Sequence, residues 1–338
     1  MKWDKRGALG AMLLTVLSIL PQAADANDLV RIGSFQGISD AGIFVAKEKG
    51  FFAEQGIDIE IQVVGSASDV TTAFASGKLD VAGGSPSAGI YNAIRQGLPI
   101  EIVADSGNTS PGFGYSAFMV RKEMADKIKE IADIRGHTLA ATGYYAGASN
   151  EVTVHHLLSA GGVKESELKI VALSFPDIMT SLGTKAIDAG ILIEPLVTMA
   201  VEQNVAVVWK RGDAVYPSQQ YACLMFGPSM TKRPQVAERF MTAYLKGVRF
   251  YNDALKGKAP KAELVAILTK NTAAKNAALY DKMVYPGLNP NGTLNVAGMA
   301  KDMQWFVDAK RMKEPIDLSK VVNTSYVDAA LKKIGKYE

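Results

Sequence analysis

The residues best suited to binding a small molecule lie in short turns of glycine and serine that precede predicted helices. The clearest turn runs from Gly83 to Ser87. In this turn Ser85 is predicted to cap a helix, Pro86 suits the first helical position, and the amides of Ser87 and Ala88 remain free. Free amides at a helix start attract an anion or a carbonyl oxygen, although a capped helix end covered by water explains the same residues.

Other turns could bring hydroxyl groups and aromatic rings to the same molecule. Ser66 has the spacing of a capping box with Asp69, which predicts a hydroxyl group at a helix start. The segment 34–39 follows the first predicted strand and presents aromatic and amide side chains. The glycines of the segment 142–149 allow close backbone approach, and its adjacent tyrosines could supply a stacking face.

Two acidic residues stand next to prolines where helices are predicted to start. Asp177 follows Pro176, and Glu194 precedes Pro195. A carboxylate in the first helical turn is favoured by the helix dipole, whereas one that faces a cleft would bind a ligand amine. Both interpretations stay open for Glu194. The predicted ligand-binding residues are Phe35, Gln36, Ser66, Gly84, Ser85, Ser87, Thr142, Tyr144, Tyr145, Ser149, Asp177 and Glu194.

Side chains that usually perform catalysis or hold a metal ion are sparse in the sequence. His155 and His156 are adjacent on a predicted helix, so their rings diverge instead of meeting at one metal ion. The sequence contains no G-x-S-x-G, H-E-x-x-H or Walker motif. We therefore predict a binding protein, not an enzyme, with no catalytic residue, no cofactor and no bound metal.

Charge and cysteine content narrow the class of protein further. The chain of 338 residues has a formal net charge of +3, which is too small to indicate binding to nucleic acid or to a membrane surface. Cys223 is the single cysteine and lies in an apolar run, so a buried thiol without a disulfide is predicted. The length is sufficient for two domains with cores of their own.

The turns described above follow short apolar strands that alternate with helices, a pattern typical of α/β architecture with mainly parallel sheets. Four strands are predicted between Val30 and Asp105, and a second series begins at Ser116. After a strand near Tyr221 the chain becomes helical, with amphipathic segments at 234–254, 261–268, 296–312 and 325–334. We expect lobe 1 to comprise residues 27–115 and 222–338, and lobe 2 to be residues 116–221, inserted between them.

A short internal sequence repeat supports two similar lobes. The run from Lys78 to Ala82 closes a helix and opens a strand, and the run from Lys185 to Ala189 does the same in the second lobe.

The N-terminus has the three parts of a secretory signal peptide. Lys2, Lys5 and Arg6 form a basic region, residues 8–20 are apolar, and residues 24–26 fit an A-x-A cleavage site before Asn27. We therefore predict that residues 1–26 are removed and that the mature protein is a free periplasmic monomer.

The segment from Lys47 to Val103 closely resembles the first lobe of the ABC-transporter substrate-binding proteins that bind sulfonates, taurine, nitrate or thiamine pyrimidines. The resemblance rests on Lys49 to Phe52, Ala73 to Asp80 and Gly83 to Ser87, and in the second lobe on residues 134–140 and 187–195. It implies a two-lobed type 2 periplasmic binding protein fold. Each lobe would be a mixed, mainly parallel sheet flanked by helices, and two crossing strands at about 116–121 and 221–226 would join the lobes.

The resemblance also implies that a small solute is held between the lobes and delivered to a membrane permease. Members of this family often hold oxyanions with serine hydroxyls and helix-start amides, so we expect a small organic anion such as a sulfonate. The alternative is a heteroaromatic thiamine precursor, because Tyr144, Tyr145, Phe113, Tyr115 and Tyr221 could line a pocket for a ring. A lyase or a pyrimidine synthase is a further alternative, although the cysteine-rich motif of those synthases cannot be formed with Cys223 alone.

Overall fold

The computed structural model describes residue 1 and residues 26–338. Almost all of the predicted signal peptide, residues 1–26, therefore lies outside the described residues. Within the described residues, no helix is both long enough and apolar enough to cross a bilayer.

The first sheet contains five strands in the order β2-β1-β3-β10-β4. The strands β1 to β4 run in one direction and β10 runs against both of its neighbours, so the sheet is mixed but mainly parallel. Its strands are β1 (Asp28–Ser34), β2 (Ile57–Val63), β3 (Val81–Gly84), β4 (Glu101–Gly107) and β10 (Ala222–Phe226). The helices around it are α1 (Ala41–Glu48), α2 (Ala67–Ala75), α3 (Ala88–Arg95), α8 (Pro228–Thr231), α9 (Pro234–Leu255), α10 (Lys261–Asn271), α11 (Val296–Asp308) and α12 (Ser325–Ile334).

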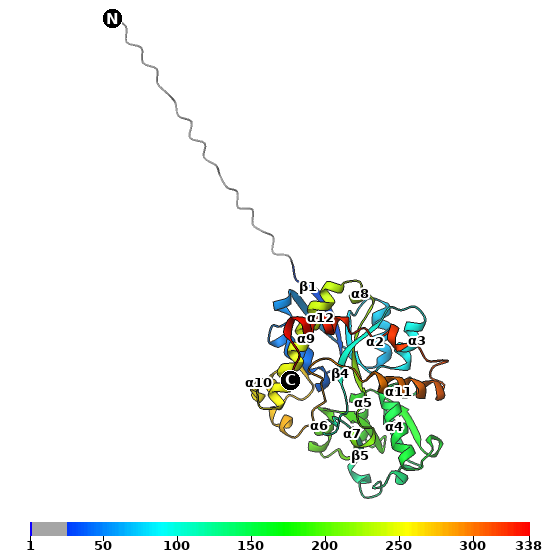
Figure 1. Ribbon diagram of the computed structural model, residues 1–338. Coiled ribbons are helices and arrows are strands. Elements are labelled where there is room, and N and C mark those ends of the chain that lie inside the picture. The colour runs from blue at the N-terminus through cyan, green and yellow to red at the C-terminus, as the bar shows by residue number, and fades with distance from the viewer. Residues whose placement is uncertain (2–25) are drawn as a thin grey trace.

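The second sheet has the order β7-β6-β8-β5-β9, in which β5 runs against its two neighbours. Its strands are β5 (Ser116–Arg121), β6 (Thr138–Ala141), β7 (Lys169–Ala172), β8 (Ala189–Ile193) and β9 (Ala206–Arg211). Its helices are α4 (Ser149–Ala160), α5 (Phe175–Gly183), α6 (Leu196–Glu202) and α7 (Gly212–Val215). Figure 1 shows β5, α4 and α7 in one half of the molecule, with β1, α8 and α12 in the other.

The short repeat in the sequence, at residues 78–82 and 185–189, lies at equivalent strands, because β3 and β8 occupy the same place in the two sheet orders. Asp80 precedes β3, accepts a hydrogen bond from the Arg31 amide at 2.8 Å and pairs with Arg233. Asp188 precedes β8, accepts from the Thr138 amide at 3.0 Å and pairs with Arg121. In both lobes the repeated aspartate therefore fixes the start of one strand against its neighbour.

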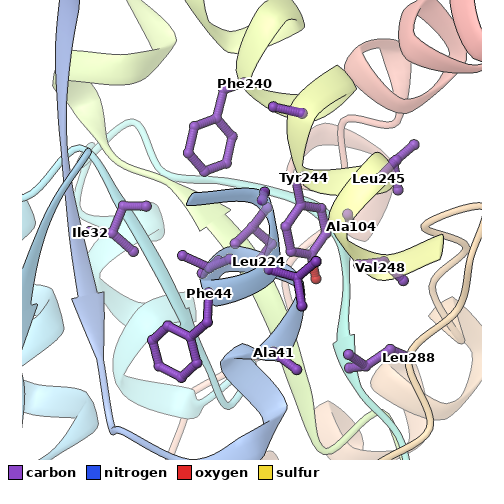
Figure 2. Close-up of a cluster of buried hydrophobic side chains, with 14 of the residues drawn as sticks. Ile32, Ala41, Phe44, Ala104, Leu224, Phe240, Tyr244, Leu245, Val248 and Leu288 are labelled. Carbon is purple, nitrogen blue, oxygen red and sulfur yellow. The ribbon is translucent and has the colours of Figure 1, made fainter. Parts of the chain in front are cut away.

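The main core of the first lobe lies between its sheet and α9. Figure 2 shows Phe240 and Tyr244 of α9 directed toward the same cluster as Phe44 of α1 and Ile32 and Leu224 of the sheet. These five side chains are buried, so they supply the apolar area that drives α9 onto the sheet. The long amphipathic helix predicted from the sequence is confirmed.

The chain passes between the sheets twice, from the end of β4 at Gly107 to Ser116 and from the end of β9 at Arg211 to Ala222. The predicted two-lobed α/β fold with mixed sheets is confirmed. The carboxyl ends of β1 and β3 and those of β6 and β8 supply residues to one cavity between the lobes, which is the usual location of ligands in open α/β sheets.

Candidate functional site

The cavity between the lobes is lined by residues from both sheets and from the two connections. It contains about 580 Å³ of space free of protein atoms, part of which belongs to its open mouth. The space that the centre of a water-sized molecule can occupy is about 60 Å³. The lining residues are Phe35, Ser39, Asp40, Ala67, Gly83, Gly84, Ser85, Tyr115, Thr142, Gly143, Ala148, Ser149, Asn150, Phe175, Ile193, Tyr221 and Ala222.

Aromatic rings from both lobes and both connections form much of the wall. Phe35 follows β1 and lies against Gly84 at the end of β3. Tyr115 and Tyr221 stand on the two connections with ring centroids 5.4 Å apart and an interplanar angle of 72°. Phe175 comes from the start of α5. The edge-to-face pair of Tyr115 and Tyr221, together with Phe35 and Phe175, gives this wall aromatic faces.

Asp40 is the acidic residue of the lining and is almost fully buried at the start of α1. Ser34 Oγ donates a hydrogen bond to Asp40 Oδ2 at 2.5 Å. Burial raises the pKa of Asp40 to about 6, against the opposing effect of hydrogen bonds from Ser34 and the Phe35 amide. A β-carbon on Gly83 would lie 3.1 Å from Asp40 Oδ1, so a glycine there leaves room beside the carboxylate. No lysine, arginine or histidine is among the lining residues, all of which are in the described part of the chain.

The second lobe contributes the polar residues at the start of α4. Asn150 Nδ2 donates to the Thr142 carbonyl at 3.1 Å, and Asn150 Oδ1 accepts from the Tyr221 hydroxyl. The Asn150 amide is therefore committed to holding the turn that follows β6. Thr142 Oγ1, by contrast, is buried without a hydrogen-bond partner among the described residues, and its residue lines the cavity. A buried hydroxyl without a partner is costly unless a ligand or water contacts it.

Ser85 and Ser149 line the cavity but bond chiefly to each other across the lobes. Ser85 Oγ accepts from the Ser149 amide at 2.7 Å and lies 2.8 Å from Ser149 Oγ, which donates to the Tyr221 carbonyl at 2.9 Å. The predicted role of Ser85 as a helix cap is wrong. The helix α3 begins at Ala88, its cap is Ser87, and Pro86 precedes it, because Ser87 Oγ reaches the Ile90 amide at 3.3 Å.

The free amides predicted at this helix start are also partly used. The Ala88 amide donates to the Gly147 carbonyl of the second lobe at 2.8 Å. Ser87 itself is buried as the cap of α3. It is not among the residues that line the inter-lobe cavity.

The structure brings Phe35, Gly84, Ser85, Thr142 and Ser149 of the predicted set together in the cavity. The other members lie outside its lining for identifiable reasons. Tyr144 packs into the core of the second lobe, whereas Tyr145 is exposed and lies under the Arg311 guanidinium, 5.4 Å from its ring centroid. Gln36 is exposed in the turn after β1.

Ser66 is a helix cap, and Asp177 is an acid in the first turn of a helix, as their spacing indicated. Ser66 Oγ accepts from the Asp69 amide at 3.2 Å, which caps α2. Asp177 is exposed in the first turn of α5, and Ser174 Oγ donates to its carboxylate at 2.5 Å. Neither residue is among those that line the cavity.

Glu194 is fully buried but serves the protein's own backbone. Its carboxylate accepts from the Thr198 amide at 2.9 Å and the Thr198 hydroxyl at 3.0 Å, and Arg211 Nη1 lies 3.4 Å away. The Val284 amide of the first lobe donates to it at 3.4 Å. Burial raises the pKa of Glu194, and the Thr198 bonds and Arg211 oppose that effect. The predicted contact of Glu194 with a ligand amine is not supported by this placement.

His155, His156 and Cys223 are used in packing, whereas His137 Nδ1 lies 3.2 Å from Asp188 Oδ2. His155 lies 5.2 Å from Trp305, and His156 stacks on Tyr216 with centroids 4.0 Å apart, so the two rings diverge as predicted. Cys223 is buried in β10, and burial raises the pKa of its thiol. The described residues contain no cluster of three or more histidine, cysteine, aspartate or glutamate side chains that could hold a metal ion.

Asp40, Ser39 and Asn150 are the polar lining residues that the sequence did not reveal as ligand contacts. Asp40 is not among the ligand-binding residues predicted from the sequence. The signal that could have identified it is its position directly behind the turn that follows β1, where the carboxyl end of a strand meets a helix N-terminus.

Two sequence relatives differ in what their names say. A Brucella abortus protein that is named as a binding protein, without a stated ligand, is 24% identical over 328 residues, covering 93% of this chain and 96% of its own. A Saccharomyces cerevisiae enzyme named 4-amino-5-hydroxymethyl-2-methylpyrimidine phosphate synthase is 27% identical over 164 residues, covering 48% of this chain and 45% of its own.

Solved structures with the same fold include several binding proteins. The ligand-binding component of an ABC-type import system from Staphylococcus aureus has a TM-score of 0.73 at 15% identity, covering 90% of this chain and 99% of its own. The nitrate-binding protein of Synechocystis PCC 6803 has a TM-score of 0.72 at 15% identity, covering 91% of this chain and 89% of its own. The alkanesulfonate-binding protein of Xanthomonas axonopodis pv. citri bound to MOPS has a TM-score of 0.70 at 13% identity, covering 89% and 100%.

The fold is not restricted to binding proteins. A desulfurization enzyme has a TM-score of 0.63 at 14% identity, covering 91% of this chain and 100% of its own. Membership is shown by the family model described as NMT1/THI5 like, which matches residues 38–254, nearly two thirds of the chain. The protein with this two-lobed fold and this inter-lobe cavity therefore belongs to the NMT1/THI5-like family.

Proposed function

We propose that the chain is the exported solute-binding subunit of an ABC importer, which captures a small solute between its lobes and delivers it to a membrane permease. The family, the fold and the location of the cavity support this function. A solute that contacts both lobes stabilises their closed arrangement by those contacts. The proposal includes cleavage after Ala26 and a monomeric periplasmic form, and mass spectrometry of the exported protein should find Asn27 as its first residue.

The solute class that the cavity supports best is a flat heteroaromatic molecule with a hydrogen-bond donor. The observation that carries this choice is a buried carboxylate, Asp40, in an aromatic lining that contains no cationic side chain. An ionised carboxylate accepts hydrogen bonds only, so an amino group or a protonated ring nitrogen of the solute would satisfy it. The same carboxylate would repel an anion at neutral pH, since its pKa is about 6. We therefore place the heteroaromatic solute ahead of the organic anion expected from the sequence.

An organic anion remains the second candidate because hydroxyl groups gather at the start of α4. Thr142, Ser85 and Ser149 all line the cavity there. Ser85 and Ser149 already bond to each other, which leaves the Thr142 hydroxyl as the group without a protein partner. One hydroxyl and a helix start compensate an anion less well than a cationic side chain would.

Binding without chemical change is the simpler role for these lining residues. The histidines and the cysteine of the described chain are not among them. Asp40 is the one lining carboxylate and could act as a base, so catalysis is tested by recovering the solute after incubation and measuring its mass. We expect the mass to be unchanged.

Calorimetry of the mature protein at pH 7.5 with three probes separates these functions. The probes are 4-amino-5-hydroxymethyl-2-methylpyrimidine, MOPS and nitrate. The proposal predicts binding of the pyrimidine, with a stabilisation of about 2.7 kcal/mol at a hundredfold excess over Kd. Tight binding of MOPS or nitrate, with none of the pyrimidine, would establish the anion alternative instead.

A further inference from the structure

The turn that carries Tyr144 and Tyr145 has a use that solute binding does not explain. It ends at Gly147, and Glu151 lies one helical turn beyond, in α4 of the second lobe. Figure 1 shows α4 alongside α11, which belongs to the C-terminal part of the first lobe. Arg311 follows α11 and faces this turn.

Glu151 is fully buried and both of its carboxylate oxygens are engaged. Arg311 Nε donates to Oε1 at 2.7 Å, and Arg311 Nη2 lies 2.6 Å from the same oxygen. The Gly147 amide donates to Oε2 at 2.8 Å. The Glu151 carboxylate of the second lobe is thus paired with Arg311 of the first lobe. Through the Gly147 amide, the same carboxylate also holds the turn that precedes α4.

Gly147 connects this ion pair to the first lobe at a second point. Its carbonyl accepts from the Ala88 amide at the start of α3, at 2.8 Å. Its φ of +66° is a left-handed conformation, and a β-carbon there would lie 2.3 Å from the Ala88 β-carbon. The backbones of the two lobes therefore approach as closely as a glycine permits. The Arg311 carbonyl accepts from Asn92 Nδ2 of α3 at 3.0 Å, which joins both contacts on the first lobe.

The residues directly after Gly147 line the cavity. Ala148, Ser149 and Asn150 form the wall that the second lobe contributes at the start of α4. We propose that Glu151 and Arg311 are positioning residues: their inter-lobe ion pair fixes how the second lobe docks on α3 and thereby sets the position of this wall. The consequence for capture rests on the proposed function, whereas the docking itself can be tested without any solute.

A buried ion pair has a recognisable signature when it is altered. Removing one partner leaves a buried charge without compensation, whereas replacing both by neutral side chains is much less costly. Arg311→Gln and Glu151→Gln should therefore each loosen the docking, and the double variant should resemble the wild type more closely than Arg311→Gln does. Arg311→Lys keeps the charge but loses the two-nitrogen geometry, so an intermediate effect is expected.

Hydrogen exchange followed by mass spectrometry, on the mature protein without added solute, tests the proposal across the lobes. Arg311→Gln should raise exchange at least tenfold in the second-lobe peptide that contains Gly147, and Glu151→Gln should do so in the first-lobe peptide that contains Ala88. The matched control is Lys282→Gln, which removes an exposed inter-lobe pair with Glu202 at 2.6 Å and should leave both peptides unchanged.

Three results would overturn the assignment. They are increases confined to the lobe that carries the substitution, additive effects in the double variant, or an equal response from Lys282→Gln. If Arg311→Gln does not fold, Arg311→Lys is measured instead. An exchange rate at Gly147 in Arg311→Lys that equals the wild-type rate would contradict the positioning role. Failure of all three solute probes would refute the proposed solute classes and leave the exchange result intact.

Discussion

At the scale of single residues, Asp40 carries the proposed recognition, and its buried charge is expected to lower the stability of the folded protein. Its carboxylate is buried beside Ser34 in a lining without a cation. Burial raises its pKa to about 6, so at neutral pH the folded protein holds a charge that it would accommodate better as the neutral acid. Groups that lower stability in this way are common in binding sites.

Replacing Asp40 by asparagine should therefore stabilise the protein without a solute. The neutral side chain avoids the burial of a charge, and at pH 7.5 we expect the free energy of unfolding to rise by roughly 1 to 3 kcal/mol. Urea denaturation measures this change. Asp177→Asn is the matched control, because Asp177 is exposed in the first turn of α5, and it should lower stability by about 0.3 to 1 kcal/mol instead of raising it. A destabilised Asp40→Asn protein would show that the carboxylate is required for folding.

The same carboxylates predict how stability depends on pH. Burial raises the pKa of Asp40, Asp105 and Asp302 from 3.8 to about 6 in each case. Between about pH 4 and pH 6 the folded state therefore binds more protons than the unfolded state, and stability falls as pH rises through that window. The pKa of His156 is lowered by burial and acts in the opposite direction below pH 6.5.

The carboxylates outnumber the histidine, so the melting temperature should be higher at pH 5 than at pH 7.5. Each carboxylate contributes about 1 kcal/mol to this difference. Differential scanning calorimetry at the two pH values measures it, and Asp40→Asn should reduce it. An equal or lower melting temperature at pH 5 would contradict the assignment of these buried acids.

The sequence identified small-residue turns but not the direction of each side chain within them. Ser85 and Ser149 face the cavity, whereas Ser66 and Ser87 turn back onto their own helices as caps. All four are compatible with a helix start by residue type. Which of them faces a ligand depends on how the other lobe docks, and a local pattern does not contain that information.

At the scale of elements, α3 illustrates how a helix start can be misplaced by two residues. Ser85 and Ser87 both suit a cap, and Pro86 suits the first helical position. The structure places the cap at Ser87. The Ser85 hydroxyl instead accepts a hydrogen bond from the Ser149 amide of the second lobe. Strands and amphipathic helices were predictable at nearly their observed bounds, since burial on one face fixes their periodicity.

Ser87→Ala should lower stability with little effect on solute affinity. It removes the cap of α3, for which a loss of about 1 kcal/mol is typical. Urea denaturation should detect that loss, while calorimetry with 4-amino-5-hydroxymethyl-2-methylpyrimidine should give a Kd within about twofold of the wild type. A large loss of affinity with unchanged stability would restore the ligand contact that the sequence suggested for Ser87.

At the scale of the whole molecule, the two lobes share one topology, and the cavity is built where their equivalent strands end. The sequence predicted a restart of the strand and helix series at Ser116, and in the structure β5 belongs to the second sheet while β10 belongs to the first. The equivalence of β3 and β8 was visible in the sequence only as a short repeat, whose aspartates Asp80 and Asp188 fix the two strand starts.

Solute capture should make the molecule more compact. A solute that contacts Asp40 in the first lobe and Thr142 in the second bridges the two, so it favours the closed arrangement. Small-angle X-ray scattering should show a smaller radius of gyration after saturation with the pyrimidine probe. An unchanged radius would show that the inter-lobe contacts of Glu151 and Gly147 already hold the lobes closed without a solute.

The most direct test of the account is calorimetry of 4-amino-5-hydroxymethyl-2-methylpyrimidine with the wild type, Asp40→Asn and Asp177→Asn at pH 7.5. Asp177 is a carboxylate that the sequence favoured and that lies outside the cavity lining, so it serves as the matched control. The account predicts binding by the wild type, an unchanged Kd for Asp177→Asn, and a loss on the order of 1.5 to 3 kcal/mol for Asp40→Asn. Equal affinity of the wild type and Asp40→Asn, or no binding by any of the three proteins, would contradict it.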